Sequence, residues 1–233
     1  VGDLAIDSDE GARLTGLLAG SDGPLVIVDS GNNRILAVDQ EGGTAQLVGL
    51  EIASVPVVLN DPRGIAVTED RLFIADRGND RILSSDTNSG EPPFVTEELV
   101  VNISPALAAP EGLAADDNTL YISDGLNRIV RVGISSGPSN PLPGEADLLP
   151  ITGLQQGLGD ARGLSLSDTH LYIADTNNDR VVRVPLGGGD AEVVPVNDVG
   201  GLLNPTAVLT LGDEELIITD SGNDRIVVVD FDP

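Results

Sequence analysis

No cysteine occurs among the 233 residues, which excludes disulfide bonds, thiolate metal sites and a cysteine nucleophile. Methionine, tryptophan and lysine are absent as well, so all 12 basic residues are arginines. The single histidine, His170, cannot form a histidine-rich metal site, and we interpret it as structural because it stands at a loop edge without a nucleophile motif. No apolar run is long enough to span a membrane as a helix.

Basic residues are scarce relative to acidic ones, since 38 aspartates and glutamates give a formal net charge of −26. A nucleic-acid partner requires a basic surface, so we expect none, and we expect no direct insertion into a membrane. Position 1 is not a methionine. We interpret an acidic, cysteine-free chain with this start as a processed, exported protein that is extracellular or periplasmic.

What the sequence does contain is one motif in five copies. Each copy has a short apolar run that ends in aspartate, a loop of small polar residues, an arginine and a second apolar run. A nearly constant period of this kind indicates a repeat architecture. The copies span residues 25–38, 72–85, 120–132, 171–184 and 216–229, and their aspartates Asp29, Asp76, Asp124, Asp175 and Asp220 are 47, 48, 51 and 45 residues apart.

Each copy is predicted to form a β-hairpin. Residues 171–174 are apolar on both faces, too few for a helix, and rich in β-branched and aromatic side chains, as buried strands are. The motif aspartate and arginine flank the loop, where they can face each other across the ladder, and the aspartate can also accept N–H groups from its own loop. We interpret them as structural pairs: Asp29/Arg34, Asp76/Arg81, Asp124/Arg128, Asp175/Arg180 and Asp220/Arg225.

The hairpin loops are rich in glycine and asparagine, the residues that tolerate positive φ. The loop of the third copy is one residue shorter than the others. We therefore predict a different turn there, with Gly125 or Asn127 in the left-handed conformation.

Each hairpin is preceded by a run of small and apolar residues, and four hairpins are followed by a further, more mixed run. Four strands in a period of about 45 residues are typical of a propeller blade. The sequence thus predicts an all-β fold, a single domain over residues 1–233 that forms a five-bladed β-propeller of four-stranded antiparallel blades. The preceding runs begin at Gly16, Gly64, Gly112, Gly163 and Ala207, and the following runs are residues 45–50, 95–101, 146–151 and 191–196.

Two of these segments together resemble the NHL repeat. Residues 62–67 read Pro-Arg-Gly-Ile-Ala-Val, and residues 72–82 run from Leu-Phe-Ile-Ala-Asp to Arg-Ile, with Asn79 and Asp80 where that family usually has Asn-His. Five such copies cover nearly the whole chain. The resemblance implies a β-propeller but little about chemistry, because propellers host enzymes, scaffolds and sensors alike.

The last copy has three predicted strands and no fourth, whereas residues 3–6 form an apolar run at the other end of the chain. We interpret this run as the outer strand of the fifth blade, which would close the ring and remove an exposed edge. The alternative is that it pairs with a neighbouring molecule and builds a filament.

One residue per repeat, just before the inner-strand glycine or Ala207, is predicted to stand at the mouth of the central channel. In gluconolactonase-like and strictosidine-synthase-like propellers, which the chain resembles, this place supplies metal ligands, but Glu111 alone is of that type here and the arginines disfavour a cation. Either the ring binds a small anion or carboxylate through arginine, or Glu111 pairs with Arg63 and Arg162 and plugs the channel. The five residues are Thr15, Arg63, Glu111, Arg162 and Thr206.

We expect no metal or organic cofactor. Aspartate-rich loops such as residues 220–224 lack the alternating oxygen ligands and distal glutamate of an EF-hand, and the neighbouring arginine repels a cation. A weak surface calcium site is left open as an alternative.

Three functions stay open at this point. The first is a non-catalytic binding or assembly module that presents its loop face or rim to a protein or glycan partner. The second is a lactonase-like or lyase-like enzyme that acts at the channel mouth. The third is a structural subunit that polymerises by exchange of its terminal strand.

Overall fold

The computed structural model describes residues 14–19, 25–38, 45–86, 94–99, 101–134, 145–196, 200–212 and 215–231. In these ranges the regular structure is β-strand, apart from three single-turn 3-10 helices, and no helix has the length and apolar character needed to cross a membrane. Residues 3–6, the predicted closing strand, lie outside the described residues.

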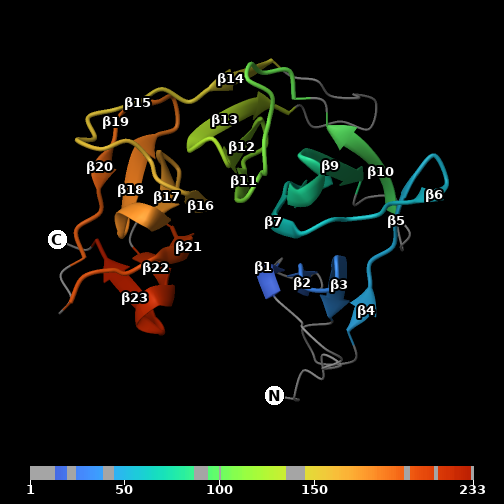
Figure 1. Cartoon of the computed structure of the whole chain (residues 1–233), viewed down its shortest axis with the longest axis horizontal. Helices are drawn as coiled ribbons and strands as arrows, with labels where there is room; N and C mark the ends of the chain where they lie inside the picture. Colours follow the sequence, from blue (N-terminus) through green and yellow to red (C-terminus); the bar gives the residue numbers. More distant parts are fainter. Residues whose placement is uncertain are drawn as a thin grey trace.

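Five small sheets, one for each sequence repeat, stand side by side as the blades of a propeller (Figure 1). The predicted all-β, five-bladed architecture is therefore confirmed. Blade 1 contains β1 (Leu14–Ala19), β2 (Leu25–Asp29), β3 (Arg34–Val38) and β4 (Gln46–Leu47), and blade 2 contains β7 (Pro62–Val67), β8 (Arg71–Asp76), β9 (Arg81–Asp86) and β10 (Phe94–Leu99). Blade 3 contains β11 (Leu113–Ala115), β12 (Thr119–Asp124), β13 (Arg128–Gly133) and β14 (Ala146–Leu148). Blade 4 contains β16 (Ala161–Leu166), β17 (His170–Asp175), β18 (Arg180–Pro185) and β20 (Glu192–Val193), and blade 5 contains β21 (Pro205–Leu211), β22 (Glu215–Asp220) and β23 (Arg225–Asp230).

The first strand of each sheet lies toward the centre of the array and the later strands lie toward the outside (Figure 1). Consecutive inner strands are in contact, β1 with β7, β7 with β11, β11 with β16 and β16 with β21. Within each blade, neighbouring strands pair antiparallel. In the described residues blade 5 shows three strands, and blades 1 and 5 form the two ends of the arc (Figure 1).

The middle strands are buried on both faces because each blade packs between two others. In β8, Phe73 and Ala75 belong to the core shared with blade 3, while Leu72 and Ile74 belong to the core shared with blade 1. This alternation explains why the sequence shows apolar runs here rather than an apolar and polar alternation.

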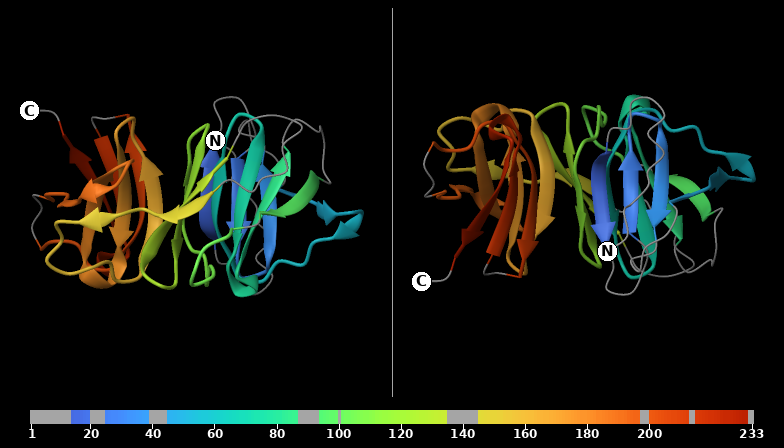
Figure 2. Two further views of the ribbon diagram at one scale, coloured as in Figure 1. Left: turned by 90° about the horizontal axis from the view of Figure 1, so that it is seen from above. Right: turned by 90° about the horizontal axis from the view of Figure 1, so that it is seen from below.

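The outer strands depart from the predicted fourth runs. In blades 1 and 4 only two residues of each run pair with the third strand. After β4 the chain leaves blade 1 and forms β5 (Leu50–Ile52), which pairs parallel with β10 of blade 2, and β6 (Val55–Pro56), which pairs with β5. This hairpin projects from the rim of blade 2 (Figure 2). A second short parallel pair joins β15 (Ile151–Thr152) and β19 (Gly189–Asp190).

A left-handed residue ends every hairpin loop, just before the motif arginine. In the third loop it is Asn127, one of the two predicted residues. Glycine does not take this position in any copy, because the side chain has a role described below. The left-handed residues are Asn33, Asp80, Asn127, Asp179 and Asp224, with φ between 51° and 56°. In blades 2, 4 and 5 the loop forms a 3-10 turn: η1 (Arg77–Asn79), η2 (Thr176–Asn178) and η3 (Ser221–Asn223).

Candidate functional site

The motif aspartate is the centre of a buried hydrogen-bond cluster in each blade. In blade 4 the Asp175 carboxylate is fully buried and accepts bonds from Arg180 Nε at 2.6 Å and from the Gly159 N–H at 2.6 Å. Asn178 Nδ2 donates to both carboxylate oxygens, at 2.9 and 3.0 Å. The second arm of Arg180 reaches the carbonyl oxygen of Gln156 at 2.6 Å. The cluster thus fastens the hairpin to the segment that leads into the inner strand.

The same ion pair recurs in all five repeats, with arginine Nε bonded to an aspartate oxygen. Because every one of these aspartates is buried and fully engaged, the motif acts as a structural clamp and leaves no oxygen directed at a ligand. The distances are 2.8 Å for Arg34–Asp29, 2.7 Å for Arg81–Asp76, 2.9 Å for Arg128–Asp124, 2.6 Å for Arg180–Asp175 and 2.6 Å for Arg225–Asp220.

The clamp lowers the pKa of at least one carboxyl group. Burial by itself would raise the pKa of Asp220, but the Asn223 side chain, the Leu203 N–H and the charge of Arg225 outweigh it and hold the pKa below the ordinary 3.8. The donors lie 2.8, 2.7 and 2.6 Å from the carboxylate oxygens. A depressed folded-state pKa stabilises the fold above the unfolded pKa, and this stabilisation is lost as the pH falls through the folded value.

We therefore predict that Asp220→Asn destabilises the protein at neutral pH and that the difference from wild type shrinks below pH 3.8. Urea unfolding of both proteins at a series of pH values measures it. Both proteins contain the same other carboxylates, so the difference between their unfolding free energies cancels the effect of protonating those groups. A difference that stays constant through this window would contradict the assignment.

The left-handed loop residue joins each blade to the next. At each of the four interfaces, the side chain of Asn33, Asp80, Asn127 or Asp179 accepts the backbone N–H that lies before the inner strand of the following blade. The bonds are Asp61 N to Asn33 at 2.7 Å, Ala109 N to Asp80 at 2.7 Å, Asp160 N to Asn127 at 2.6 Å and Asn204 N to Asp179 at 2.8 Å. Asp224 occupies the corresponding place in blade 5, where the described chain provides no following blade.

Three inner-strand glycines allow the backbones of neighbouring blades to approach. A Cβ atom at Gly64 would lie 2.5 Å from the carbonyl oxygen of Glu111, and one at Gly163 would lie 2.9 Å from that of Thr206. At Gly112 it would overlap the carbonyl oxygen of Arg162. Glycine is required here because these contacts are to backbone, which cannot rotate away.

Four of the predicted channel-mouth residues lie on inner strands and Glu111 lies two residues before β11, but the side chains of Glu111, Arg63 and Arg162 pair differently from the prediction. Glu111 does not pair with Arg63 and Arg162, as proposed for a plug. Glu111 Oε1 instead accepts from Arg77 Nε at 2.8 Å, and Arg77 lies in the hairpin loop of blade 2. Arg63 bonds Asp61 at 2.9 Å and Arg162 bonds Asp160 at 2.8 Å.

The remaining two residues complete the set. Thr206 Oγ1 lies 2.5 Å from Ser221 Oγ and 3.1 Å from Thr219 Oγ1 within blade 5. Thr15 lies on β1, the inner strand of blade 1. The bonds of Glu111, Arg162 and Thr206 described above run to other residues, so the predicted plug of Glu111 with both arginines is not formed. Binding of a small anion at the channel mouth stays a prediction.

Arg77 makes a contact between blades that the sequence pattern did not indicate. Its guanidinium bridges blades 2 and 3, since it also bonds Asp61 at 2.8 Å. Burial alone would lower the pKa of Arg77 and raise that of Asp61, but their mutual charges, with Glu111 and Arg63, reverse both effects. The lowered pKa of Asp61 and the raised pKa of Arg77 keep this pair ionised at neutral pH, which suits a structural tie rather than proton transfer.

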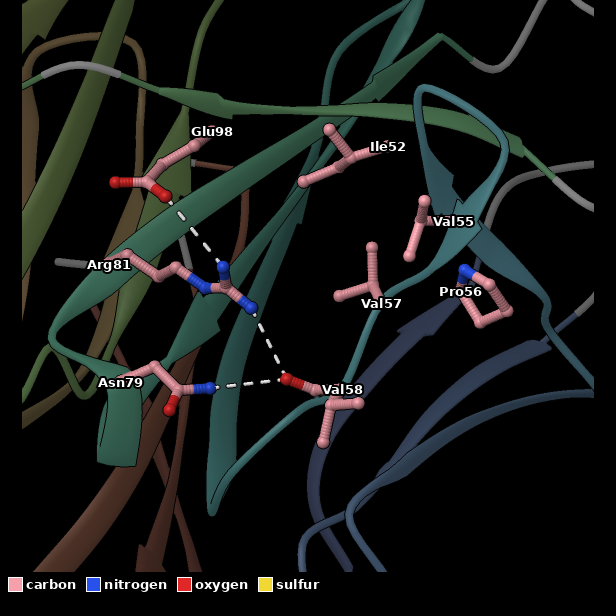
Figure 3. Close-up of a pocket in the computed structure, with 8 residues that line it drawn as sticks. All are labelled: Ile52, Val55, Pro56, Val57, Val58, Asn79, Arg81 and Glu98. Carbon is pink, nitrogen blue, oxygen red and sulfur yellow. Dashed lines mark hydrogen bonds and ion pairs between the residues drawn. The ribbon is translucent and has the colours of Figure 1, made fainter.

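A groove lies on the rim of blade 2 (Figure 3). Its volume is about 580 Å³. One wall is aliphatic, made by Ile52 and the valines that follow β5, and the other carries polar side chains from the end of the hairpin loop and from β10. The lining residues are Ile52, Val55, Pro56, Val57, Val58, Asn79, Arg81 and Glu98.

The polar side of the groove is held in place by the clamp of blade 2. Arg81 bonds the carbonyl oxygen of Val58 at 3.2 Å while its Nε remains on the motif aspartate Asp76. Asn79 donates to the same carbonyl at 3.2 Å (Figure 3). The segment that carries Val58 is thereby fixed, although the Val58 side chain is 78% exposed.

The structure gathers no metal-ligating cluster in the ranges that it describes, where no three histidine, aspartate or glutamate side chains are arranged to hold an ion. His170 begins β17 of blade 4, and its Nδ1 lies 2.8 Å from Thr169 Oγ1. The carboxylate of Asp220, in the loop considered for calcium, is bonded by Arg225.

A family model described as the LVIVD repeat matches residues 158–182, which is about half the length of one repeat of this chain. The letters of that name also occur in order at Leu25–Asp29. No curated protein matches the chain in sequence.

Solved structures with the same fold cover nearly all of the chain. A structure of the nidogen/laminin complex is 20% identical, with a TM-score of 0.72 over 94% of this chain and 76% of that one. A streptogramin B lyase is 15% identical, with a TM-score of 0.63 over 95% and 70%. A catalytically inactive variant of virginiamycin B lyase from Staphylococcus aureus with quinupristin is 16% identical, with a TM-score of 0.62 over 97% and 75%. The chain therefore has the fold of repeat β-propellers.

Proposed function

We propose that the chain is a non-catalytic binding module of the NHL-repeat type that presents the groove on the rim of blade 2 to a protein partner. The observation that carries the proposal is the aliphatic wall of this groove, where Val55 and Val58 are largely exposed. Exposed apolar side chains beside oriented polar groups are typical of surfaces that bind other proteins.

A protein suits this groove better than a glycan. Its aliphatic wall gains most from burying apolar surface, whereas sugar hydroxyls packed on valine would lose hydrogen bonds to water. The wall is also held rigid, because Arg81 and Asn79 fix the backbone of Val58, and a preorganised surface loses less entropy on binding.

The comparisons support this reading. One similar fold is seen in a complex of nidogen with laminin, so a propeller of this shape can serve protein association. In the same proposal the chain acts outside the cell or in the periplasm, and it uses no cofactor. The lyase structures share the fold alone, and the charged groups near the centre of this chain are engaged with one another.

The test is selection of a displayed random-peptide library on the immobilised chain. We expect enriched peptides with apolar side chains whose affinity falls by at least about tenfold for Val58→Asp. Leu126→Asp, at an exposed hairpin tip of blade 3, is the matched control and should bind as wild type does.

Two results would contradict the proposal. One is that no peptide is enriched, or that enriched peptides bind Val58→Asp as well as the wild type. The other is turnover in a panel of lactones and cyclic esters with added divalent metal, which would favour the enzyme at the channel mouth.

A further inference from the structure

A second cavity, called here the blade 3 cavity, lies between blade 3 and the turn that follows β18 of blade 4. Its volume is about 470 Å³, which is within the range of small-molecule sites. It shares no lining residue with the groove on blade 2. The lining includes Asp116, Tyr121, Arg131, Glu145, Asp147 and Leu186.

A guanidinium group of fixed orientation forms part of the wall. Tyr121, Arg131 and Asp147 form one row across β12, β13 and β14. Arg131 Nε donates to Asp147 Oδ1 at 3.0 Å, Nη2 donates to the other oxygen of the same carboxylate, and Nη1 donates to the carbonyl oxygen of Gly187 at 3.4 Å. Bonds of this kind lie in the plane of the guanidinium, so they hold it without using the faces on which an aromatic ring can stack.

Blade 4 shows what such a row binds. Tyr172, Arg183 and Glu192 form the equivalent row, and Arg183 donates from Nε and Nη2 to Glu192 at 3.1 and 2.7 Å. The ring of Phe231 lies 6.0 Å from the Tyr172 ring and 5.9 Å from the Arg183 guanidinium carbon. The row of blade 4 therefore holds an aromatic ring, which the segment after β23 supplies.

The row of blade 3 has a leucine at the place of this ring. Phe231 is the sixth residue after the motif arginine of blade 5, and the sixth residue after that of blade 4 is Leu186. Leu186 packs against the cluster that contains Tyr121, and its carbonyl oxygen accepts from the Tyr121 hydroxyl at 3.2 Å. Leucine is smaller than phenylalanine and has no π face, and the cavity opens beside it.

These 233 residues cannot supply a ring to the cavity from an undescribed segment. Their five aromatic residues all lie at described positions. Residues 135–144, which join β13 to β14, contain neither an aromatic nor a basic residue. A ring that occupies the cavity must therefore come from outside these residues. The five aromatic residues are Phe73, Phe94, Tyr121, Tyr172 and Phe231.

The charge of the cavity selects the kind of ring. Three carboxylates and one guanidinium line it, so its formal charge is negative. Asp116 Oδ1 accepts the N–H groups of Asn118 and Thr119, both at 2.8 Å, which fixes this carboxylate. Burial raises the pKa of Tyr121 above the ordinary 10.0, and the charge of Asp116 adds to the effect. A positively charged group is therefore favoured beside these residues.

We propose that the blade 3 cavity binds a small aromatic amine. The ring lies against the guanidinium of Arg131, as the Phe231 ring does in the equivalent row of blade 4, and the ammonium group lies toward Asp116 and Glu145. Asp147 neutralises Arg131, so the arginine does not repel the ammonium group. The site is separate from the groove of blade 2, so each proposal can fail without the other.

Isothermal titration calorimetry of the whole chain with 2-phenylethylamine at low salt tests the proposal. We expect saturable binding at one site. 2-Phenylethanol, which lacks the charge, and 2-cyclohexylethylamine, which lacks the π face, should each bind at least about threefold more weakly. Phenylalanine amide has the same ring and ammonium group, and its affinity relative to 2-phenylethylamine distinguishes the N-terminus of a peptide from a free amine as the natural source.

Leu186→Phe places in blade 3 the ring that Phe231 provides in blade 4. It should weaken binding of 2-phenylethylamine by at least about tenfold while the circular dichroism spectrum stays that of wild type. Leu126→Phe, the same substitution at the exposed hairpin tip of blade 3, is the matched control and should leave the affinity unchanged.

Asp116→Asn provides a second variant that keeps an oxygen for the N–H groups of Asn118 and Thr119. It should weaken binding of the amine by about threefold and leave binding of 2-phenylethanol unchanged. A wild-type chain that shows no saturable binding of the amine would overturn the proposal. So would a Leu186→Phe variant that binds the amine as wild type does, or an alcohol that binds as tightly as the amine.

Discussion

Asp175→Ala is expected to lower the free energy of unfolding by about 3–5 kcal/mol, the range for removing one partner of a buried ion pair. The substitution leaves Arg180, which is mostly buried, without its carboxylate, and it leaves the Gly159 N–H without an acceptor. A buried donor without a partner costs more than the bond itself contributed. Urea denaturation monitored by circular dichroism measures the change.

Asp168→Ala is the matched control for this prediction. Asp168 lies in the same blade, at an exposed turn before β17. Exposed substitutions of this kind usually change stability by less than about 0.5 kcal/mol. The motif aspartate could not be the clamp described above if the two variants lost similar amounts of unfolding free energy, or if Asp175→Ala lost less than about 1 kcal/mol.

Gly112→Ala is the second substitution with a large expected effect. The added methyl group would overlap the Arg162 carbonyl oxygen, and Ser123 Oγ, which bonds both the Gly112 N–H and that carbonyl, lies 3.0 Å from it. Relief requires blades 3 and 4 to separate, because the overlapping atom belongs to backbone. Overpacking of this kind typically lowers the free energy of unfolding by about 1–3 kcal/mol. We expect a loss near the upper end of this range because the contact is rigid.

Gly157→Ala separates the steric effect from the general effect of losing a glycine. Nothing lies within 4 Å of a Cβ atom at this position. Its unfolding free energy should stay at the wild-type value or rise by up to about 1 kcal/mol, because alanine restricts the unfolded chain. Equal stability of Gly112→Ala and Gly157→Ala would show that blades 3 and 4 do not pack as described.

The sequence could predict the blades because their signals are local and repeated. Each strand of a hairpin lies beside its neighbour in the chain, and the apolar runs and loop residues recur with one period. The Asp175 and Arg180 pairing follows from their places at either end of one loop. The same repetition made the number of sheets and their order predictable.

Contacts between blades were harder to predict because they depend on geometry that a single repeat does not carry. Arg77 reaches Glu111 across a blade boundary and over 34 residues of sequence, and it has no counterpart in the other hairpin loops. The parallel pairing of β5 with β10 likewise joins segments of two different repeats. The left-handed Asp80 and Asp179 were missed because their side chains serve the next blade rather than their own turn.

One signal for the exposed end was present in the sequence. Four repeats have glycine at the start of the inner-strand run, whereas the fifth has Ala207. The structure gives the reason: glycine is needed only where another blade approaches. A difference between otherwise equivalent repeats thus marks the blade that is followed by no other blade within the described residues.

A crystal structure of the chain at side-chain resolution tests the central claim most directly, which is that five repeats form five blades clamped by aspartate and packed through glycine. We expect inner strands in the order β1, β7, β11, β16 and β21, with Gly112 against the Arg162 carbonyl and arginine Nε bonded to the motif aspartate in every repeat. A map in which the motif aspartates are exposed to solvent, or in which these sheets neighbour one another in a different order, would contradict it.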